Sequence, residues 1–302
     1  MPSQTVFRLT SRNGFDGLQA SQEPIPTPGQ YEVLVKVRSV SLNYRDIAIA
    51  NSWYPLPVKD NVIPCSDMAG EVVEVGDSVK GFSVGDRVLS ALGDRWLYGA
   101  FNPADEIYGS NEDGLLRQYV ALPAHAVIKL PDTSHTLTQW AAVPCTGATV
   151  WSAFYGGIPL KPGDRVLIQG TGGVALTALI FAKAAGAITI ITSSSDEKLE
   201  YVQSKFGADH TINYKTHPNW EAEVLRITNA EGVDHVIEIG GEATIRQSIE
   251  AVTFGGVISL VGFLGSRPEG DMPDLTAMAM YKNCCIRGIL GGSKQLLEQA
   301  SG

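Results

Sequence analysis

The segment VLIQGTGGVALTAL, residues 166–179, passes from an apolar strand-like run through a glycine-rich loop into a helix-like run. Gly170, Gly172 and Ala175 form the pattern GxGxxA within it. The first glycine permits a tight turn, the second lets the backbone approach a pyrophosphate, and the alanine lets helix and strand pack closely. The pattern predicts a dinucleotide site, although a purely structural strand-to-helix turn can carry the same glycines.

The start of the helix after this loop is the expected binding point for the phosphates. Gly173 and Val174 open the helix. Backbone N–H groups in a first helical turn have no partner within the helix and carry a partial positive charge. We therefore expect these two residues to contact the cofactor together with the loop glycines.

The end of the next strand, about 20 residues on, distinguishes the two nicotinamide dinucleotides, because an acidic residue there would hold the ribose of NAD. The sequence instead has hydroxyls on Ser193, Ser194 and Ser195 and an ammonium group on Lys198. These groups favour a 2′-phosphate, so we expect NADP(H) in preference to NAD(H). In the structural alternative, Ser194 and Glu197 form a helix capping box and Lys198 is only a solvated charge.

The hydrophobic patterns divide the chain into two parts. Up to about residue 126, short alternating segments broken by Gly and Pro indicate a mostly antiparallel β domain, with a long loop at 93–116. From residue 131, apolar strands alternate with helical stretches, which predicts a parallel sheet covered on both faces. The expected strands are 31–42, 70–76, 84–92 and 117–130 in the first part and 166–168, 188–192, 236–239, 257–261 and 286–290 in the second.

Charge and composition exclude several classes of partner. The chain has 23 basic and 32 acidic residues and a net charge of -9, which argues against nucleic-acid or anionic-membrane surfaces. No apolar run approaches the ~18 residues of a membrane helix, so we expect a soluble, cytoplasmic protein. The four cysteines form no close CxxC pair and fit a reducing compartment. The expected partner is a small molecule.

Two long segments resemble the medium-chain dehydrogenase/reductase superfamily in both their residues and their order along the chain. They are GEVVEVGDSVKGFSVGDRV (70–88) and LKPGDRVLIQGTGGVALTALIFAKAAGA (160–187). The resemblance covers nearly the whole chain. It implies the α/β class, with a GroES-like β-barrel catalytic domain over 1–130 and a Rossmann doubly wound parallel sheet over 131–302. It also implies a homodimer that pairs through the last Rossmann strand, and a C-terminal segment returning to the catalytic domain, which we expect to be missing here.

The positions that hold the catalytic zinc in the superfamily's alcohol dehydrogenases are altered in this chain. Where those enzymes have a Cys three residues before an Asp, NYRD has Asn43 before Asp46. Where they have a His before a Glu, this chain has Ser66 before Asp67. Asn and Ser are poor zinc ligands, and the loop 93–116 contains no cysteine for a structural zinc. The chain therefore resembles the zinc-free quinone oxidoreductase and zinc-type-dehydrogenase-like branches, and we expect no metal.

The loss of zinc restricts the expected chemistry. Zinc polarises a carbonyl oxygen directly, and without it a plain ketone is a poor hydride acceptor. A conjugated carbonyl yields an enolate, whose charge is spread and can be held by one or two hydrogen-bond donors. We expect NADPH-dependent reduction of an enone, enal or quinone. The alternatives are a zinc-free alcohol or carbonyl dehydrogenase and a nicotinamide-binding protein without redox turnover.

The resemblance places the candidate catalytic groups in the first domain. Asn43, Tyr44 and Tyr54 are the candidate donors, and Asp46 would orient or support them. Tyr54 matches a pocket tyrosine of quinone oxidoreductases and is expected to hydrogen-bond the carbonyl oxygen. The structural alternative is a wall residue at a cleft edge for each tyrosine, and hydrogen bonding to local backbone for Asn43.

The resemblance also implies a wider set of cofactor contacts, for each of which ordinary packing at the sheet ends is the alternative. They are Thr146 and Thr149 beside the nicotinamide, Gly240 and Gly241 at the end of the fourth strand, Gly262, Phe263, Ile289 and Leu290 around the nicotinamide ribose and carboxamide, and Tyr214 near the 2′-phosphate.

Overall fold

The computed structural model describes residues 2–102, 104–262 and 274–302. Its contacts divide the chain into two units, one made of Met1–Ala148 with Gly292–Gly302 and the other of Thr149–Gly291. Within the described ranges, no helix is long and apolar enough to cross a membrane.

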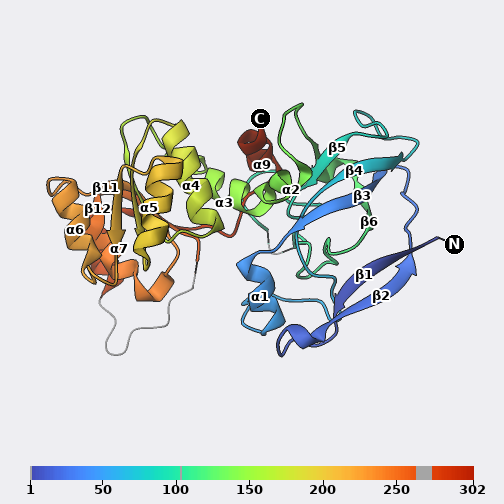
Figure 1. The fold of residues 1–302 in the computed structure, drawn as a ribbon, viewed down its shortest axis with the longest axis horizontal. Helices are drawn as coiled ribbons and strands as arrows, with labels where there is room; N and C mark the ends of the chain where they lie inside the picture. Colours follow the sequence, from blue (N-terminus) through green and yellow to red (C-terminus); the bar gives the residue numbers. More distant parts are fainter. Residues whose placement is uncertain (1, 103, 263–273) are drawn as a thin grey trace. The chain divides into compact units, whose positions relative to one another are not determined.

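The first unit contains a curled antiparallel sheet with the strand order β6-β3-β4-β5-β7 and a separate hairpin, β1 with β2 (Figure 1). Alternate residues of β3, such as Val33 and Val35, are buried against Met68 and Val72 of β4, which explains the alternating pattern in the sequence. This half-barrel confirms the expected GroES-like architecture. The elements are β1 Ser3–Leu9, β2 Leu18–Pro24, β3 Glu32–Ser41, α1 Tyr44–Ala50, β4 Asp67–Val75, β5 Arg87–Ser90, β6 Tyr119–Pro123, β7 Val127–Lys129, α2 Leu137–Ala141, the start of α3 Val143–Tyr155, and α9 Lys294–Ser301.

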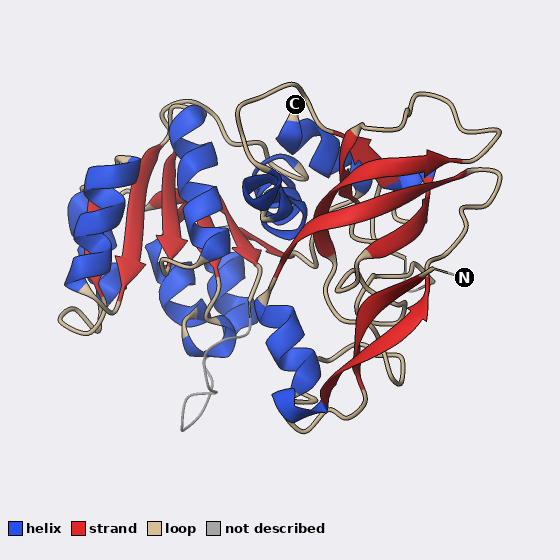
Figure 2. Cartoon of the chain, turned by 45° about the vertical axis from the view of Figure 1, so that its right-hand side comes forward, coloured by secondary structure: helices blue, strands red, loops and turns tan. Residues whose placement is uncertain are grey.

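The second unit is a six-stranded parallel sheet in the order β10-β9-β8-β11-β12-β13, with helices on both faces (Figure 2). Both faces of β8 are buried: Val166 and Ile168 belong to one core cluster and Leu167 to the other. The elements are β8 Arg165–Gln169, α4 Gly173–Ala184, β9 Ile188–Ser193, α5 Asp196–Phe206, β10 His210–Asn213, α6 Trp220–Ile227, β11 Val233–Glu238, α7 Ile245–Ala251, β12 Val252–Leu260, α8 Leu275–Lys282 and β13 Cys285–Gly288.

The strand order of the second unit reverses at β8. The chain runs from β8 outward to β9 and β10, and then crosses to β11 on the other side of β8. Connections on the two sides of such a point leave a crevice beyond the carboxyl ends of the strands, where ligands bind in open α/β sheets. A ligand site is therefore expected at the carboxyl ends of β8 and β11.

The two packed units meet at residues 148 and 149, whereas the predicted boundary between the domains lies at residue 130. Trp140 of α2 and Leu297 of α9 belong to one core cluster with Ala69 and Leu89 of the first unit. The apolar faces of these two helices are therefore buried against the curled sheet. Residues Gly292–Gly302 pack with the first unit.

Candidate functional site

The glycine-rich loop leaves open space above the start of α4. Gly170 has φ +78°, a conformation that favours glycine, and Gly172 caps the helix with an ordinary φ of -84°. A Cβ atom added at either position would meet no atom within 4 Å. The N–H of Leu176 donates to the Gly172 carbonyl at 2.9 Å, so the N–H groups of Gly173 and Val174 precede the helix's own ladder. This arrangement can hold an anion such as a pyrophosphate.

A cavity of about 420 Å³ lies next to this loop at the reversal point of the sheet. Three of the predicted cofactor residues line it together: Gly170, Tyr214 and Gly240. The full lining is Gln169, Gly170, Thr192, Tyr214, Pro218, Trp220, Ile239, Gly240, Ala243, Thr244 and Gln247. Its aromatic and apolar walls with a few polar groups suit a nucleoside.

A buried hydrogen-bond network, which the sequence analysis missed, fixes this end of the sheet. Glu238 is fully buried at the end of β11 and accepts from the N–H groups of Gly240 at 2.8 Å and Gly241 at 3.0 Å. Gln169, at the end of β8, donates to the same carboxylate at 2.7 Å and accepts from the Gly240 N–H at 3.1 Å. Thr244 and Ser248 complete the network as hydroxyl donors. Predicted cofactor residues Gly240 and Gly241 are therefore held by Glu238.

The serines after β9 have partly structural roles. The Ser193 hydroxyl lies 3.5 Å from that of Thr171 in the glycine loop. Ser195, and not Ser194, caps α5: its hydroxyl accepts from the N–H of Lys198 at 3.4 Å. The alternative of a Ser194–Glu197 capping box is therefore wrong, because the helix begins one residue later than that box requires. The Lys198 side chain is exposed.

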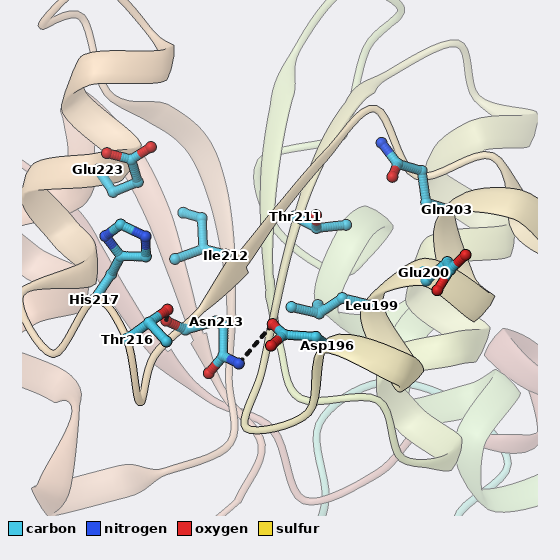
Figure 3. Close-up of a pocket in the computed structure, with 10 residues that line it drawn as sticks. All are labelled: Asp196, Leu199, Glu200, Gln203, Thr211, Ile212, Asn213, Thr216, His217 and Glu223. Carbon is cyan, nitrogen blue, oxygen red and sulfur yellow. Dashed lines mark hydrogen bonds between the residues drawn. The ribbon is translucent and has the colours of Figure 1, made fainter.

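The first acidic residue after β9 is directed away from the cavity at the reversal point. The Asp196 carboxylate accepts from the Asn213 amide at 2.7 Å (Figure 3). Both residues line a second cavity of about 380 Å³, built from α5, β10 and the start of α6 at the edge of the sheet. Asp196 does not line the cavity that contains Gly170 and Tyr214.

The other predicted cofactor residues are distributed as follows. Thr146 and Thr149 both lie on α3, and the Thr146 hydroxyl donates to the Ala142 carbonyl at 2.7 Å. Gly262 allows close approach of two strand ends, since a Cβ there would lie 2.4 Å from the Ile239 carbonyl oxygen. Ile289 is buried in a core cluster, whereas Leu290 is 48% exposed. Phe263 lies outside the described residues.

In the first unit, Asn43 and Asp46 form the start of α1. Asn43 is the cap residue, and its N–H donates to the Asp46 carboxylate at 2.8 Å. Burial raises the pKa of Asp46, and the charge of Arg45 opposes that shift. Tyr44, on the first turn of α1, is 44% exposed. The structure thus gives Asn43 and Asp46 a helix-capping contact in addition to any role in the site.

Asp67, which was not among the predicted site residues, is fully buried at the start of β4. Its carboxylate accepts from the Ser66 hydroxyl at 2.6 Å and from the Cys145 N–H at 2.9 Å. Burial raises the pKa of Asp67 to about 6, although these hydrogen bonds, Asn43 and the charge of Arg45 act in the opposite direction. Asp67 therefore joins the altered zinc position Ser66 to Cys145, and all three lie in the first unit.

Tyr54 lies in the same cluster. Burial raises the pKa of its phenol, while the charge of Arg45 and hydrogen bonds to Arg45 and Ser110 lower it. The nearby Cys145 raises it as well. A half-buried phenol with polar partners can donate a hydrogen bond to a substrate oxygen.

The altered zinc positions carry Asn43 and Ser66, which are not among the usual side-chain ligands of zinc. In the part of the chain that the structure describes, no three His, Cys, Asp or Glu side chains are grouped so that they could hold a metal. A tetrahedral zinc site needs at least three such ligands.

Two family models match the chain. Residues 29–132 match the alcohol dehydrogenase GroES-like domain, and residues 173–301 match the model described as zinc-binding dehydrogenase. The matches fall on the curled sheet and on the parallel sheet respectively.

Relatives of known sequence or structure agree with these matches. A zinc-type alcohol dehydrogenase-like protein of Schizosaccharomyces pombe is 44% identical over 298 residues, which is 95% of this chain and 84% of the relative. A Sinorhizobium meliloti 1021 protein assigned as an alcohol dehydrogenase has 37% identity and a TM-score of 0.88, covering 100% of this chain and 89% of its own. A quinone oxidoreductase of Pseudomonas syringae pv. tomato has 26% identity and a TM-score of 0.80, covering 98% and 86%. The chain therefore belongs to the medium-chain dehydrogenase/reductase superfamily of NAD(P)H-dependent oxidoreductases.

Proposed function

We propose that this protein uses NADPH to reduce an activated double bond, in an enone, enal or quinone, without zinc. The observations that carry the proposal are the half-buried phenol of Tyr54 and, in the same unit, the buried Asp67 carboxylate, which accepts from Ser66 at one of the altered zinc positions and from the Cys145 N–H. A phenol donor suits an oxygen whose negative charge is delocalised. The similarity to a quinone oxidoreductase supports the same reaction class.

The proposed reaction assigns separate roles to the two units. When bound, NADPH would supply a hydride to the substrate's β-carbon. The Tyr54 hydroxyl holds the carbonyl oxygen and stabilises the enolate that results, and solvent provides the proton for the α-carbon. Asn43 and Asp46 maintain the start of α1, and Tyr44 on its first turn is kept as a further candidate donor.

The residues proposed to contact the cofactor come from the glycine loop, the adjoining cavity, the helices α3 and α5, and the ends of β9 to β13. Its residues are Thr146, Thr149, Gly170, Gly172, Gly173, Val174, Ser193, Ser194, Ser195, Lys198, Tyr214, Gly240, Gly241, Gly262, Phe263, Ile289 and Leu290. The turning of Asp196 toward Asn213 supports NADP(H), because no carboxylate then lines the cavity beside Tyr214.

Lys198→Ala tests the preference for NADPH. The ammonium group of Lys198 is proposed to contact the 2′-phosphate, so its loss is expected to weaken NADPH binding about tenfold and leave NADH binding unchanged. Fluorescence titration with both dinucleotides measures the effect. Lys205→Ala, which removes an exposed lysine from the last turn of the same helix, is the matched control. Equal weakening of NADPH and NADH by Lys198→Ala would contradict the assignment.

Tyr54→Phe tests the donor to the substrate oxygen. Removal of one hydroxyl is expected to lower kcat for a simple enone by about tenfold or more, with the NADPH dissociation constant unchanged. Tyr31→Phe removes a hydroxyl from an exposed tyrosine of the same unit and is expected to have no effect. Unchanged turnover in Tyr54→Phe would remove this residue from the mechanism.

The names of the zinc-type alcohol dehydrogenase-like relatives favour a second candidate, a zinc-free alcohol or carbonyl dehydrogenase. Reduction of NADP⁺ by simple alcohols, with no oxidation of NADPH by enones or quinones, would support it. Dinucleotide binding without turnover of any of these substrates would indicate a binding protein.

We also propose a cytoplasmic homodimer that acts on a small molecule and does not bind nucleic acid or membranes. The net charge of -9 disfavours both polyanionic partners. Strand β13 is at the end of the sheet order, and pairing with a second copy would cover its free edge. Light scattering coupled to gel filtration distinguishes monomer from dimer.

A further inference from the structure

Two polar side chains at the start of α7 line the cavity at the reversal point of the sheet. Thr244 is the cap residue of α7, and Gln247 lies on the first turn of that helix. Residues three apart on a helix share one face, with their Cβ atoms about 5–6 Å apart. Both side chains can therefore act on the same group of a ligand in this cavity.

The Thr244 hydroxyl directs its proton into the protein. It donates to the Glu238 carboxylate, and the other acceptor within reach is the side-chain oxygen of Gln169 at 3.4 Å. Glu238 is fully buried and also accepts from two backbone N–H groups, so it offers lone pairs to the hydroxyl. A hydroxyl has one proton and two lone pairs. Toward the cavity, Thr244 can therefore only accept a hydrogen bond.

The amide of Gln247 is oriented by two acceptors. Its Nε2 atom donates to the Pro218 carbonyl at 2.8 Å and to the Glu221 carboxylate. Neither a carbonyl nor a carboxylate can donate, so the end of the amide that faces them is the NH₂ group, and both of its protons are used. The other end is the oxygen Oε1, which can only accept. Thr244 and Gln247 thus present acceptors to a ligand.

A planar ring that bears an amino group with two protons matches this pair of acceptors. Its two N–H bonds diverge by about 120°, so acceptors at about 2.9 Å from the nitrogen lie about 5 Å apart, close to the spacing of Thr244 and Gln247. Ile239 and Trp220 are among the apolar walls of the cavity, which suit a flat ring. The 6-amino group of adenine meets these requirements, whereas the 6-oxo group of hypoxanthine would turn an acceptor toward two acceptors.

We propose that Thr244 and Gln247 determine which base the site takes: both accept from the 6-amino group of the dinucleotide's adenine, and they exclude a 6-oxopurine. The inference rests on the proposed function, because it needs the dinucleotide to bind at the glycine loop with its base in the adjoining cavity. It assigns the base specificity of that site to two side chains of α7.

Equilibrium binding of two dinucleotides tests the inference. NADPH and its analogue with hypoxanthine in place of adenine are titrated by nicotinamide fluorescence. The protein is expected to bind the analogue at least tenfold more weakly, because two hydrogen bonds are lost and acceptors face one another. Equal affinities would overturn the inference. The same comparison with NADH and its hypoxanthine analogue makes the result independent of the preference for NADPH.

Gln247→Met and Thr244→Val each remove one acceptor with little change in side-chain size. Each is expected to weaken NADPH binding several-fold and to leave binding of the hypoxanthine analogue unchanged, so that the ratio of the two dissociation constants falls toward one. Thr244→Ser keeps the hydroxyl and should retain the wild-type ratio. A purely structural effect on the loop would weaken both dinucleotides alike, and a ratio that stays at its wild-type value in both variants would contradict the proposal.

Arg246→Met is the matched control. Arg246 lies between the two residues in the sequence, but its guanidinium pairs with Glu250 at 3.0 Å on the exposed side of α7 and does not line the cavity. Its loss should leave the ratio unchanged. Enone reduction that is as efficient with the hypoxanthine analogue as with NADPH would refute this inference alone. Selective binding of the adenine dinucleotide without any enone turnover would refute only the proposed function.

Discussion

Gly172→Val is expected to abolish dinucleotide binding and leave the protein folded. The position has φ -84°, which valine adopts without strain, and an added Cβ meets no protein atom within 4 Å. The valine side chain would instead fill the space through which a pyrophosphate approaches the N–H groups of Gly173 and Val174. Loss of two hydrogen bonds to a charged group corresponds to about 3–6 kcal/mol, or at least a hundredfold in affinity.

Fluorescence titration with NADPH and thermal unfolding of the ligand-free protein together measure this expectation. Gly172→Ala provides a graded comparison, because a single methyl group fills less of the same space and should weaken binding less. A Gly172→Val protein that retains its affinity for NADPH would show that the phosphates do not bind at this loop.

Glu238→Ala is expected to destabilise the second unit by about 3–5 kcal/mol. The fully buried carboxylate accepts from Gly240, Gly241, Gln169, Thr244 and Ser248. Alanine would remove the acceptor of the Gly241 N–H and of the Ser248 hydroxyl, whereas Gly240, Thr244 and Gln169 keep second acceptors. The cost of an unpaired buried donor is about 1–3 kcal/mol each before relaxation. Glu238→Gln keeps one side-chain oxygen as an acceptor and should cost less.

Urea unfolding of the ligand-free protein measures the effect of Glu238→Ala. Glu200→Ala, on the exposed surface of α5, is the control and should change stability by no more than about 0.5 kcal/mol. If Glu238→Ala also changed stability by so little, the network would not be what holds the loop with Gly240 and Gly241.

Much of the fold follows from local sequence patterns. The predicted strands correspond to β3, β4, β5, β8, β9, β11, β12 and β13, because their apolar residues repeat at intervals set by burial on one or two faces. The hairpin β1 with β2 and the edge strand β10 were not predicted. β2 is largely exposed and β10 is only four residues long, so neither carries a strong hydrophobic pattern. The predicted segment 117–130 forms two strands, β6 and β7, separated by a short turn.

The glycine loop could be predicted from a local motif, whereas contacts that join distant residues could not. The spacing of Gly170 and Gly172 in the sequence was enough to predict the loop between β8 and α4. Gln169 and Glu238 meet across 69 positions of sequence, and nothing in their local context distinguishes them from other polar residues at strand ends.

The most direct test of the account is the oxidation of NADPH by the chelator-treated protein, followed by absorbance, with an enone, an enal and a quinone as acceptors. Metal analysis of the same sample confirms that zinc has been removed. We expect substrate-dependent oxidation that survives chelation and is faster with NADPH than with NADH. Tight NADPH binding without oxidation by any of these acceptors, or activity that returns only when zinc is added back, would contradict it.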